Sequence, residues 1–223
     1  MIDDYTRDAI LITLRVASLA TISSFLFSVA LARIMSRRDF PGRRVLDALC
    51  TLPIVLPPTV LGFFLLVLVG RRGVFGQWLA EMGVNLVFSW QGAVLASTVV
   101  VFPLIYKSAR AAFESVDPDL ENAARSLGAG EFAVFFLVSL PQAKNGIIAG
   151  TMLAFARGMG EFGATLMIAG NIPGKTQTLA LAIYDSFSAG KDAEAALLAA
   201  ITSAICMAVL IGSDWLLNRT GRR

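Results

Sequence analysis

The sequence predicts an all-α polytopic membrane protein with about five transmembrane helices. Of the 223 residues, 56% are hydrophobic and only 16% are charged, a composition typical of a chain that lies in lipid. Its apolar segments are each close to the ~20 residues that a helix needs to cross a ~30 Å hydrocarbon core. They lack the strict alternation of a barrel strand, and in lipid only a helix or a closed barrel satisfies every backbone hydrogen bond. The segments are therefore predicted to be helices.

Five of these segments are predicted to span the membrane within a single domain over residues 1–223. The first is too long, and too polar at its start, for a cleaved signal peptide, and no small-residue cleavage site follows it. The second contains Pro53, Pro57 and Pro58, and because proline removes a backbone donor we expect a kink there. The predicted spans are residues 10–35, 46–69, 92–112, 146–169 and 195–217.

The distribution of Lys and Arg between the spans predicts the orientation of the chain. Loops rich in these residues lie in the cytoplasm under the positive-inside rule. The N-terminus is therefore predicted outside and the C-terminus inside, with residues 113–141 as a cytoplasmic loop. The side assigned to the cytoplasm carries Arg33, Arg37, Arg38, Arg43, Arg44, Lys107, Arg110, Arg125, Lys144, Arg219, Arg222 and Arg223, and the opposite side carries Arg7, Arg71, Arg72, Lys175 and Lys191.

Composition argues against several functional classes. The net charge of +3 does not indicate nucleic-acid binding, because the positive residues follow the topology and none lies among aromatic residues in a stacking platform. The chain has no His, and Cys50 and Cys206 lie inside predicted spans without metal-ligand or redox spacing. It also lacks a Gly-x-x-x-x-Gly-Lys-Ser/Thr phosphate loop. We therefore expect no metal or cofactor bound by this chain and no ATPase site of its own.

Residues 117–128 have the signals of a short capped helix. Asp117 is a helix-capping residue, and Pro118 suits the first helical position, where its missing N–H costs nothing. Asp119 and Glu121 place negative charge at the positive end of the helix dipole. This polar segment is therefore predicted to be a helix outside the lipid.

The rest of this loop contains small residues on one helix face and a residue that ends the helix. Ala123 and Ala124 let a partner's groove approach the helix backbone, and Gly128 supplies a left-handed end. A second, apolar helix is predicted from Glu131 to Leu140, ended by Pro141. The loop is either a capped helical hairpin that contacts no other protein or the docking site at which a partner protein binds the membrane domain.

The spacing of Ala123, Ala124 and Gly128 before Val138-Ser139-Leu140-Pro141 resembles the cytoplasmic loop of ATP-binding-cassette (ABC) importer permeases. In that family an Ile stands where Val138 stands here, and the Glu comes one place later than Glu121. The resemblance implies the type I importer permease fold, in which this loop forms a coupling helix seated in a cleft of the nucleotide-binding subunit. The coupling residues that it implies here are Asp117, Glu121, Ala123, Ala124, Arg125, Leu127 and Gly128.

A second stretch of sequence restricts the resemblance to a smaller group of permeases within that family. Residues 154–165, AFARGMGEFGAT, are similar to a segment shared by the permeases for molybdate, sulfate and tungstate. The stretches at residues 40–42, 52–58, 70–73 and 171–176 look most like the molybdate permease subunits. The resemblance implies the membrane subunit of an ATP-driven molybdate importer in the bacterial inner membrane, with sulfate, thiosulfate or tungstate as the alternative anion.

The same resemblance implies the partners of the chain. They are two copies of an ABC ATPase subunit, which bind the ATP and Mg²⁺, and an extracytoplasmic oxyanion-binding protein. A second copy of this chain is expected as well, because five spans with one mid-membrane charge pair make a poor pore alone. Lipid surrounds the spans, and no nucleic acid is expected.

Arg157 and Glu161 are charged residues near the middle of the predicted fourth span. They are four residues apart and hence on one helix face. An isolated charge at that depth costs about 2.5–3.5 kcal/mol on insertion scales, so each should be paired. The pair either fixes helix packing or belongs to the translocation pathway or a gate. Pro57 and Pro58 leave the same choice between a structural kink and a bend at an outer gate.

Two other functional classes remain as alternatives. An ion-coupled secondary transporter would be expected to show inverted repeats and more mid-membrane ionisable groups than Arg157 and Glu161. A membrane scaffold without transport would not need the docking geometry of the loop.

Overall fold

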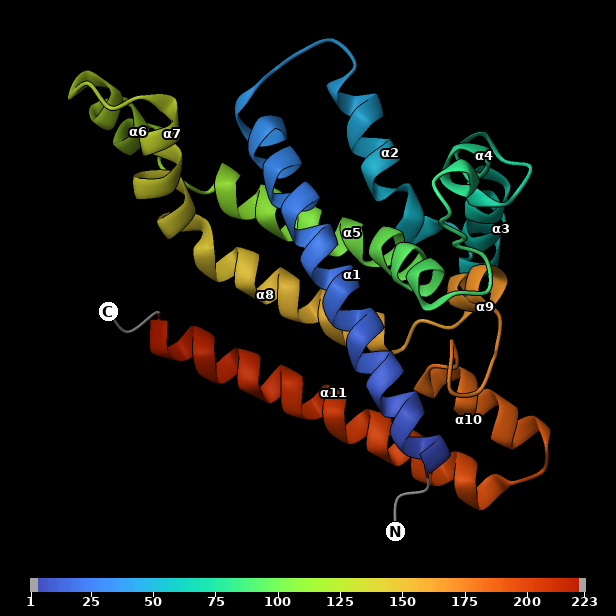
Figure 1. Ribbon diagram of the computed structural model, residues 1–223. Coiled ribbons are helices and arrows are strands. Elements are labelled where there is room, and N and C mark those ends of the chain that lie inside the picture. The colour runs from blue at the N-terminus through green and yellow to red at the C-terminus, as the bar shows by residue number, and fades with distance from the viewer. Residues whose placement is uncertain (1–3, 221–223) are drawn as a thin grey trace.

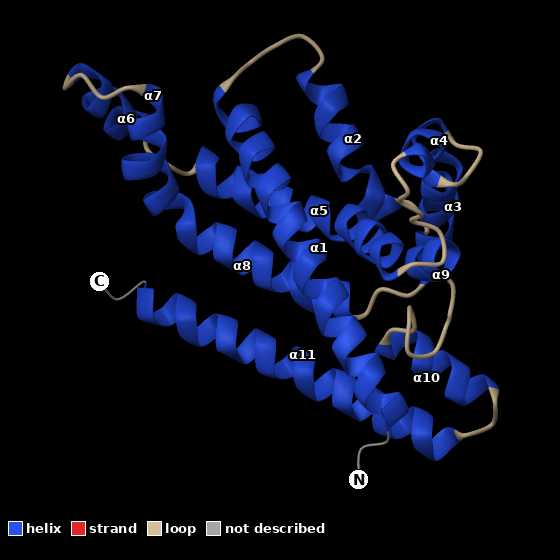
Figure 2. Ribbon diagram, viewed as in Figure 1, coloured by secondary structure: helices blue, strands red, loops and turns tan. Residues whose placement is uncertain are grey.

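The computed structural model describes the backbone of residues 4–220 and the side chains of residues 4–212, and within these residues every regular element is a helix (Figure 2). Four helical runs are long and apolar enough to cross a membrane, or five if one bent pair counts as a span. This confirms the predicted all-α membrane fold with about five spans. Of the C-terminal arginines, Arg222 and Arg223 lie outside the described residues. The four runs are α1 (Asp4–Arg37), α5 (Trp90–Glu114), the run from Glu131 to Met159, and α11 (Asp192–Thr220).

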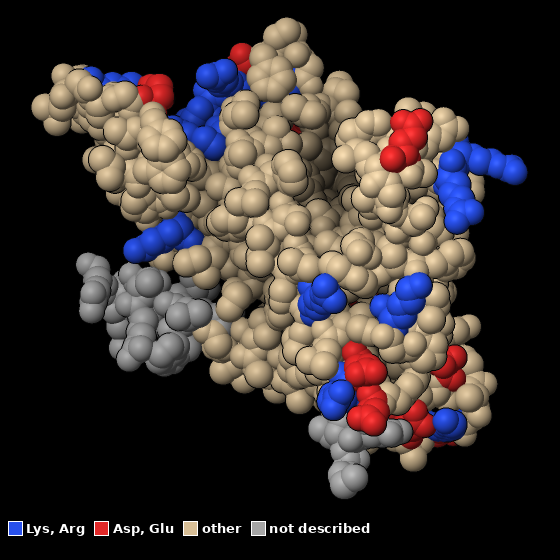
Figure 3. Space-filling view, viewed as in Figure 1, with Lys and Arg blue, Asp and Glu red and all other residues tan. Residues whose placement is uncertain are grey.

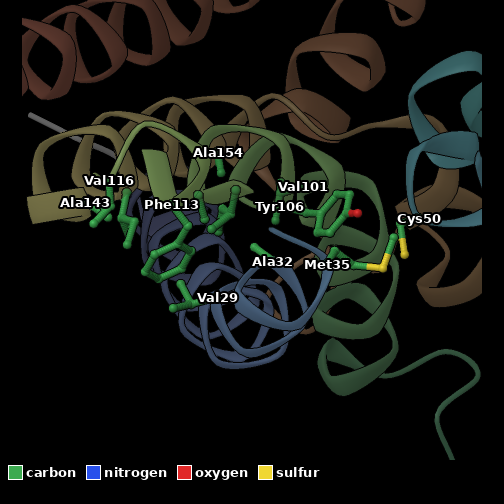
Figure 4. Close-up of a cluster of buried hydrophobic side chains, with 13 residues drawn as sticks. Val29, Ala32, Met35, Cys50, Val101, Tyr106, Phe113, Val116, Ala143 and Ala154 are labelled. Atoms are coloured by element: carbon green, nitrogen blue, oxygen red, sulfur yellow. The ribbon is translucent and has the colours of Figure 1, made fainter. Parts of the chain in front are cut away.

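The centre of the molecule is formed by α1, α5 and α8 (Leu140–Met159), which contact one another along their lengths (Figure 1). Because lipid is as apolar as the side chains between the helices, close packing stabilises this contact within the membrane more than removal from water does. The approach of α8 to α5 requires Gly146, where an added Cβ would lie 2.7 Å from the Cβ of Ala112. The buried side chains between the helices include Val29, Ala32, Met35, Val101, Tyr106, Phe113, Ala143 and Ala154 (Figure 4).

The span predicted over residues 46–69 is not one kinked helix. It consists of α2 (Arg43–Val55) and α3 (Pro58–Val69), which are bent by 116° relative to each other. Pro57 and Pro58 cannot donate to the preceding turn, and Leu56 has the extended backbone that a residue before proline prefers. The prolines therefore mark the right place, but the helix ends and restarts there.

The apolar helix predicted to end at Pro141 continues instead. The chain runs without a break from α7 (Glu131–Val134) through a π-helical turn, η1 (Phe135–Ser139), into α8. In the wide turn the N–H of Leu140 bonds to the carbonyl of Phe135, five residues back. Pro141 then falls in the first turn of α8, where it needs no donor.

The span predicted over residues 146–169 is also wrong at its end. The helix stops at Met159, and a separate short helix, α9 (Gly163–Ala169), follows. The gap between them contains Gly160, which ends α8, and Glu161. The run from Glu131 to Met159 is long and apolar enough to contain the membrane span, and α9 follows it.

The remaining helices cover the two ends of the molecule. α6 (Pro118–Ser126) and α7 project at the upper left of Figure 1, and α10 (Leu179–Ser188) lies at the opposite end beside α1 and α11. The short α4 (Val74–Glu81) packs on α3. Charged side chains on the face in Figure 3 gather at the upper end of α1 and on the α6 region, and again near the start of α1.

Arg110, near the upper end of α5, has acidic partners. Asp47 of α2 accepts a hydrogen bond from the Tyr106 hydroxyl at 2.8 Å and pairs with Arg110 of α5. The Nε of Arg110 also donates to Glu114 at 2.8 Å. These bonds hold α2 against α5 at the end where α6 begins.

Candidate functional site

The loop over residues 117–141 begins with the predicted helix cap. Asp117 has extended backbone geometry, and its Oδ1 accepts the N–H of Asp119 at 2.9 Å. Pro118 occupies the first helical position of α6. The capping oxygen satisfies one of the free N–H groups that every helix start leaves.

The end of α6 is a Schellman turn built on Gly128. Its φ is 87°, in the left-handed region. The Gly128 N–H bonds to the Arg125 carbonyl at 2.9 Å, and the Ala129 N–H bonds to the Ala124 carbonyl at 3.1 Å. A Cβ at Gly128 would meet nothing within 4 Å. Glycine is thus required by the backbone and not by crowding.

Glu121 is turned into the molecule, away from any partner's reach. Its side chain is only 2% exposed, and Oε1 accepts hydrogen bonds from Arg33 at 3.0 Å, Arg37 at 2.9 Å and Ser139 at 2.7 Å. Burial alone would raise the pKa of Glu121, but the bonds from Arg33 and Ser139 and the two guanidinium charges lower it. The carboxylate is therefore ionised at neutral pH.

Sequence reasoning missed all three of these partners of Glu121. Arg33 and Arg37 count only as topology signals in the sequence, although their four-residue spacing near the end of α1 places them on one face. Ser139 is part of the Val-Ser-Leu-Pro stretch but has no signal of its own. Together they fasten α6 to α1 and to η1.

Arg125 faces its own loop. Its Nε donates to Glu131 at 2.6 Å and its Nη1 donates to Asn122 at 3.0 Å, so it joins α6 to α7. A second ion pair reaches Glu121 at 3.5 Å. Like Glu121, Arg125 stabilises the fold of the loop and contributes little to the surface that a partner could contact.

The outer surface of the loop includes an apolar patch. Leu127 is 89% exposed, and Leu120 and Ala123 are exposed on the same side of α6, whereas Ala124 is half-buried. Phe132 of α7 is 78% exposed. An apolar patch on an otherwise polar helix pair is typical of a surface that another protein covers.

A second site lies where α8 gives way to α9. Arg157, in the last turn of α8, has a half-exposed side chain, and its Nη1 lies 3.0 Å from Oε2 of the buried Glu161. The two residues are paired, but Glu161 lies beyond the end of α8, so they do not share a helix face as the sequence suggested. The other carboxylate oxygen accepts the N–H of Ala164 at 3.0 Å and caps α9.

The break between α2 and α3 meets this second site. The side chain of Arg157 lines a cavity of about 170 Å³ whose other walls are apolar and include Pro53 and Pro58. At Gly163 an added Cβ would lie 2.8 Å from the Cβ of Pro58. The structure thus brings three of the four predicted gate candidates, Pro58, Arg157 and Glu161, to one place, and Pro57 forms the adjoining cap of α3.

Comparison with known proteins identifies the family of the chain. Residues 16–222 match the family described as binding-protein-dependent transport system inner membrane component. The chain belongs to this family. The match includes both the 117–141 loop and the two helix breaks.

Individual members of the inner membrane component family resemble the chain over nearly its whole length. The molybdenum transport system permease protein ModB of Escherichia coli K12 is 46% identical over 218 residues, 97% of this chain and 95% of that protein. The sulfate transport system permease protein CysT of the same strain is 35% identical over 95% of this chain and 76% of its own length. A crystal structure of a bacterial alginate ABC transporter with its periplasmic protein superposes with a TM-score of 0.79 at 15% identity, covering 97% of this chain and 80% of that one, which supports the fold.

Proposed function

We propose that this permease is the membrane-spanning subunit of an ATP-driven molybdate importer. The observation that carries the proposal is the 46% identity to a molybdenum transport permease over 97% of this chain and 95% of that protein. The matched region covers 97% of this chain and therefore spans the 117–141 loop and the two helix breaks.

The proposed complex contains two copies of this chain, two ABC ATPase subunits that bind ATP and Mg²⁺, and an extracytoplasmic oxyanion-binding protein. The chain is oriented with its N-terminus outside and its C-terminus in the cytoplasm. The apolar face with Leu120, Ala123 and Leu127 then points into the cytoplasm and seats in a cleft of the ATPase subunit. Asp117 and Gly128 define the two ends of the seated helix, and Glu121 and Arg125 hold its shape.

The translocation pathway in this proposal passes the two helix breaks. Arg157 supplies a positive charge beside a cavity of about 170 Å³, and a doubly charged oxyanion would be attracted to it. Glu161 is its only acidic partner among the described residues. A passing anion would compete with that carboxylate, so that the pair opens as the substrate moves through and closes behind it.

Reconstitution tests the proposal. The purified chain with its ATPase subunit in proteoliposomes is expected to take up molybdate only when both ATP and the external binding protein are supplied. ATP-independent uptake driven by a proton or sodium gradient would contradict it and favour an ion-coupled transporter.

Sulfate is the second candidate substrate, because the sulfate permease CysT is 35% identical over 95% of this chain. Calorimetric titration of the binding protein with molybdate, tungstate, thiosulfate and sulfate separates the candidates. The highest affinity for molybdate would support the proposal. The highest affinity for sulfate or thiosulfate would mean that the complex imports that anion instead.

A further inference from the structure

Three segments of the chain meet at one buried carboxylate. Glu121 of α6 accepts bonds from α1, through Arg33 and Arg37, and from η1, through Ser139. The Nη2 of Arg37 also donates to the carbonyl of Val116, just before α6, at 3.0 Å. The start of the loop is therefore bonded directly to the last turns of α1, and its end is bonded to α1 through Glu121.

Arg33 also lies over two neighbouring aromatic rings, which are tilted relative to each other. The guanidinium of Arg33 lies 5.8 Å from the ring centre of Phe113 in α5 and 5.9 Å from that of Phe135 in η1. With side chains only 15% and 21% exposed, Arg33 and Arg37 are held tightly between helices. A displacement of α6 must move them or break these bonds.

α1 is suited to carry such a displacement. It is one helix of 34 residues without Gly or Pro, which at 1.5 Å per residue is about 50 Å long. The route through α8 is less rigid, because it contains the π-turn η1 and ends at Gly160. Helices bend at such interruptions.

The far end of α1 is fastened to α10 by a second buried contact. The Oγ1 of Thr13 accepts the N–H of Leu179, the first residue of α10, at 2.8 Å and donates to Ala9 at 2.7 Å. Ala9, Leu179, Ala182 and Leu198 pack into one buried cluster around it. The N–H of Leu179 belongs to a helix start and would otherwise be a buried donor without a partner.

We propose that Glu121 is a positioning residue that locks the 117–141 loop to α1, and that α1 transmits the movement of the loop to α10 at the opposite face. This inference rests on the proposed function. It assigns the gate and the outer face to different routes: α8 leads from the loop to Arg157, and α1 leads from the loop to α10. Closure of the ATPase subunits would thus displace the outer face, where the external binding protein docks. Docking of that protein would displace the loop by the same path.

Two substitutions test the two ends of this path in the full complex. Glu121→Gln removes the charge but keeps the shape, and Thr13→Val removes the acceptor for Leu179. Asp39→Asn is the control for the first, because Asp39 is an exposed carboxylate whose ion-pair partner among the described side chains is Arg43. Thr202→Val is the control for the second, because the Thr202 hydroxyl donates to the Leu198 carbonyl of its own helix at 2.8 Å.

The measured quantities are molybdate uptake per ATP hydrolysed in proteoliposomes and the stimulation of ATP hydrolysis by the binding protein. E121Q and T13V are each expected to lower both at least fivefold while the ATPase subunit still co-purifies, and both controls are expected to stay within twofold of the wild type.

A normal ratio and normal stimulation in either variant would overturn the inference. If E121Q fails to assemble, T13V decides alone, since it lies far from the loop. A wild type that imports no molybdate would contradict the proposed function, but the loss of ATPase stimulation in the two variants would still report on the α1 path.

Discussion

The molecule contains two sites at which a buried glutamate meets arginine, and they differ in how firmly the glutamate is held. Glu121 and Glu161 are both 2% exposed. Glu121 accepts three hydrogen bonds on one oxygen. Glu161 has a single ion pair with Arg157, and its Oε2 lies 3.0 Å away without hydrogen-bond geometry.

The surroundings of the two sites differ in the same sense. The first carboxylate has three hydrogen-bond donors from two neighbouring segments, as expected for a rigid joint. The second lies between two helix breaks and next to a cavity lined by Arg157. We infer that the 117–141 loop moves as a body and that rearrangement is confined to the region around Arg157. The following predictions can break or sharpen this contrast.

The largest effect is expected from charge reversal at Arg157. R157E places a second carboxylate beside the buried Glu161, which loses its charge partner and gains a like charge instead. Molybdate uptake by the reconstituted complex should fall below detection, while K144E, an exposed reversal on the same helix, should not reduce it more than twofold.

The double swap R157E/E161R sharpens the result. It restores the charge pair but not the bond to the Ala164 N–H, so uptake should return only in part. Full uptake in both single reversals would remove the paired-charge hypothesis.

A tenfold or greater loss of coupling is expected from Gly128→Leu. A non-glycine residue in the left-handed region costs roughly 1–2 kcal/mol, and the turn that ends α6 would shift. Uptake per ATP should drop while the protein still inserts in the membrane. Gly130→Ala is the matched control, because Gly130 has a φ of −71° and open space around it; unchanged uptake in the Gly128 variant would refute the docking role of the loop.

A smaller change, about threefold in uptake, is expected from Gly163→Ala. The new Cβ would press on Pro58 at 2.8 Å and separate α9 from α3. Gly160→Ala serves as the comparison, since its nearest neighbour would be 3.8 Å away. Equal uptake by the two variants would show that the contact between the breaks does not matter for transport.

The smallest effect concerns pH. The pKa of Glu121 is lowered from 4.5 in the folded protein, so the stability that its ionised form contributes is fully present above that value and is lost only as the pH falls through the lower folded value. Limited proteolysis of the loop should therefore proceed at the same rate at pH 6 and pH 8. Faster cleavage at pH 6 would show that Glu121 titrates there and is not held as described.

Local signals in the sequence predicted much of the loop. Asp117 and Pro118 give the start of α6, and Gly128 gives its end, because caps and left-handed turns depend on neighbouring residues alone. The apolar spans are equally local. The partners of Glu121 could not be predicted, because Arg33 is 88 positions away and leaves no pattern near it.

The second site shows the same limit. The sequence indicated that Arg157 and Glu161 pair, but their spacing also fits a continuous helix, and only the fold reveals the break at Gly160. At Pro141 the sequence predicted a helix end where the structure has a continuous helix, since the π-turn that precedes this proline has no reliable sequence signal. The meeting of Pro58 with Gly163 joins residues that are distant in the chain and likewise follows from packing alone.

The central claim is that the 117–141 loop lies in the cytoplasm and is the docking site that an ATPase subunit covers. It is tested most directly by thiol labelling of a Leu127→Cys variant in which the two free cysteines, Cys50 and Cys206, are first replaced by Ser. The account predicts that a membrane-impermeant reagent labels this position in inverted vesicles but not in right-side-out vesicles, and that added ATPase subunit protects it. Labelling from the extracytoplasmic side, or no protection by the ATPase subunit, would contradict the account.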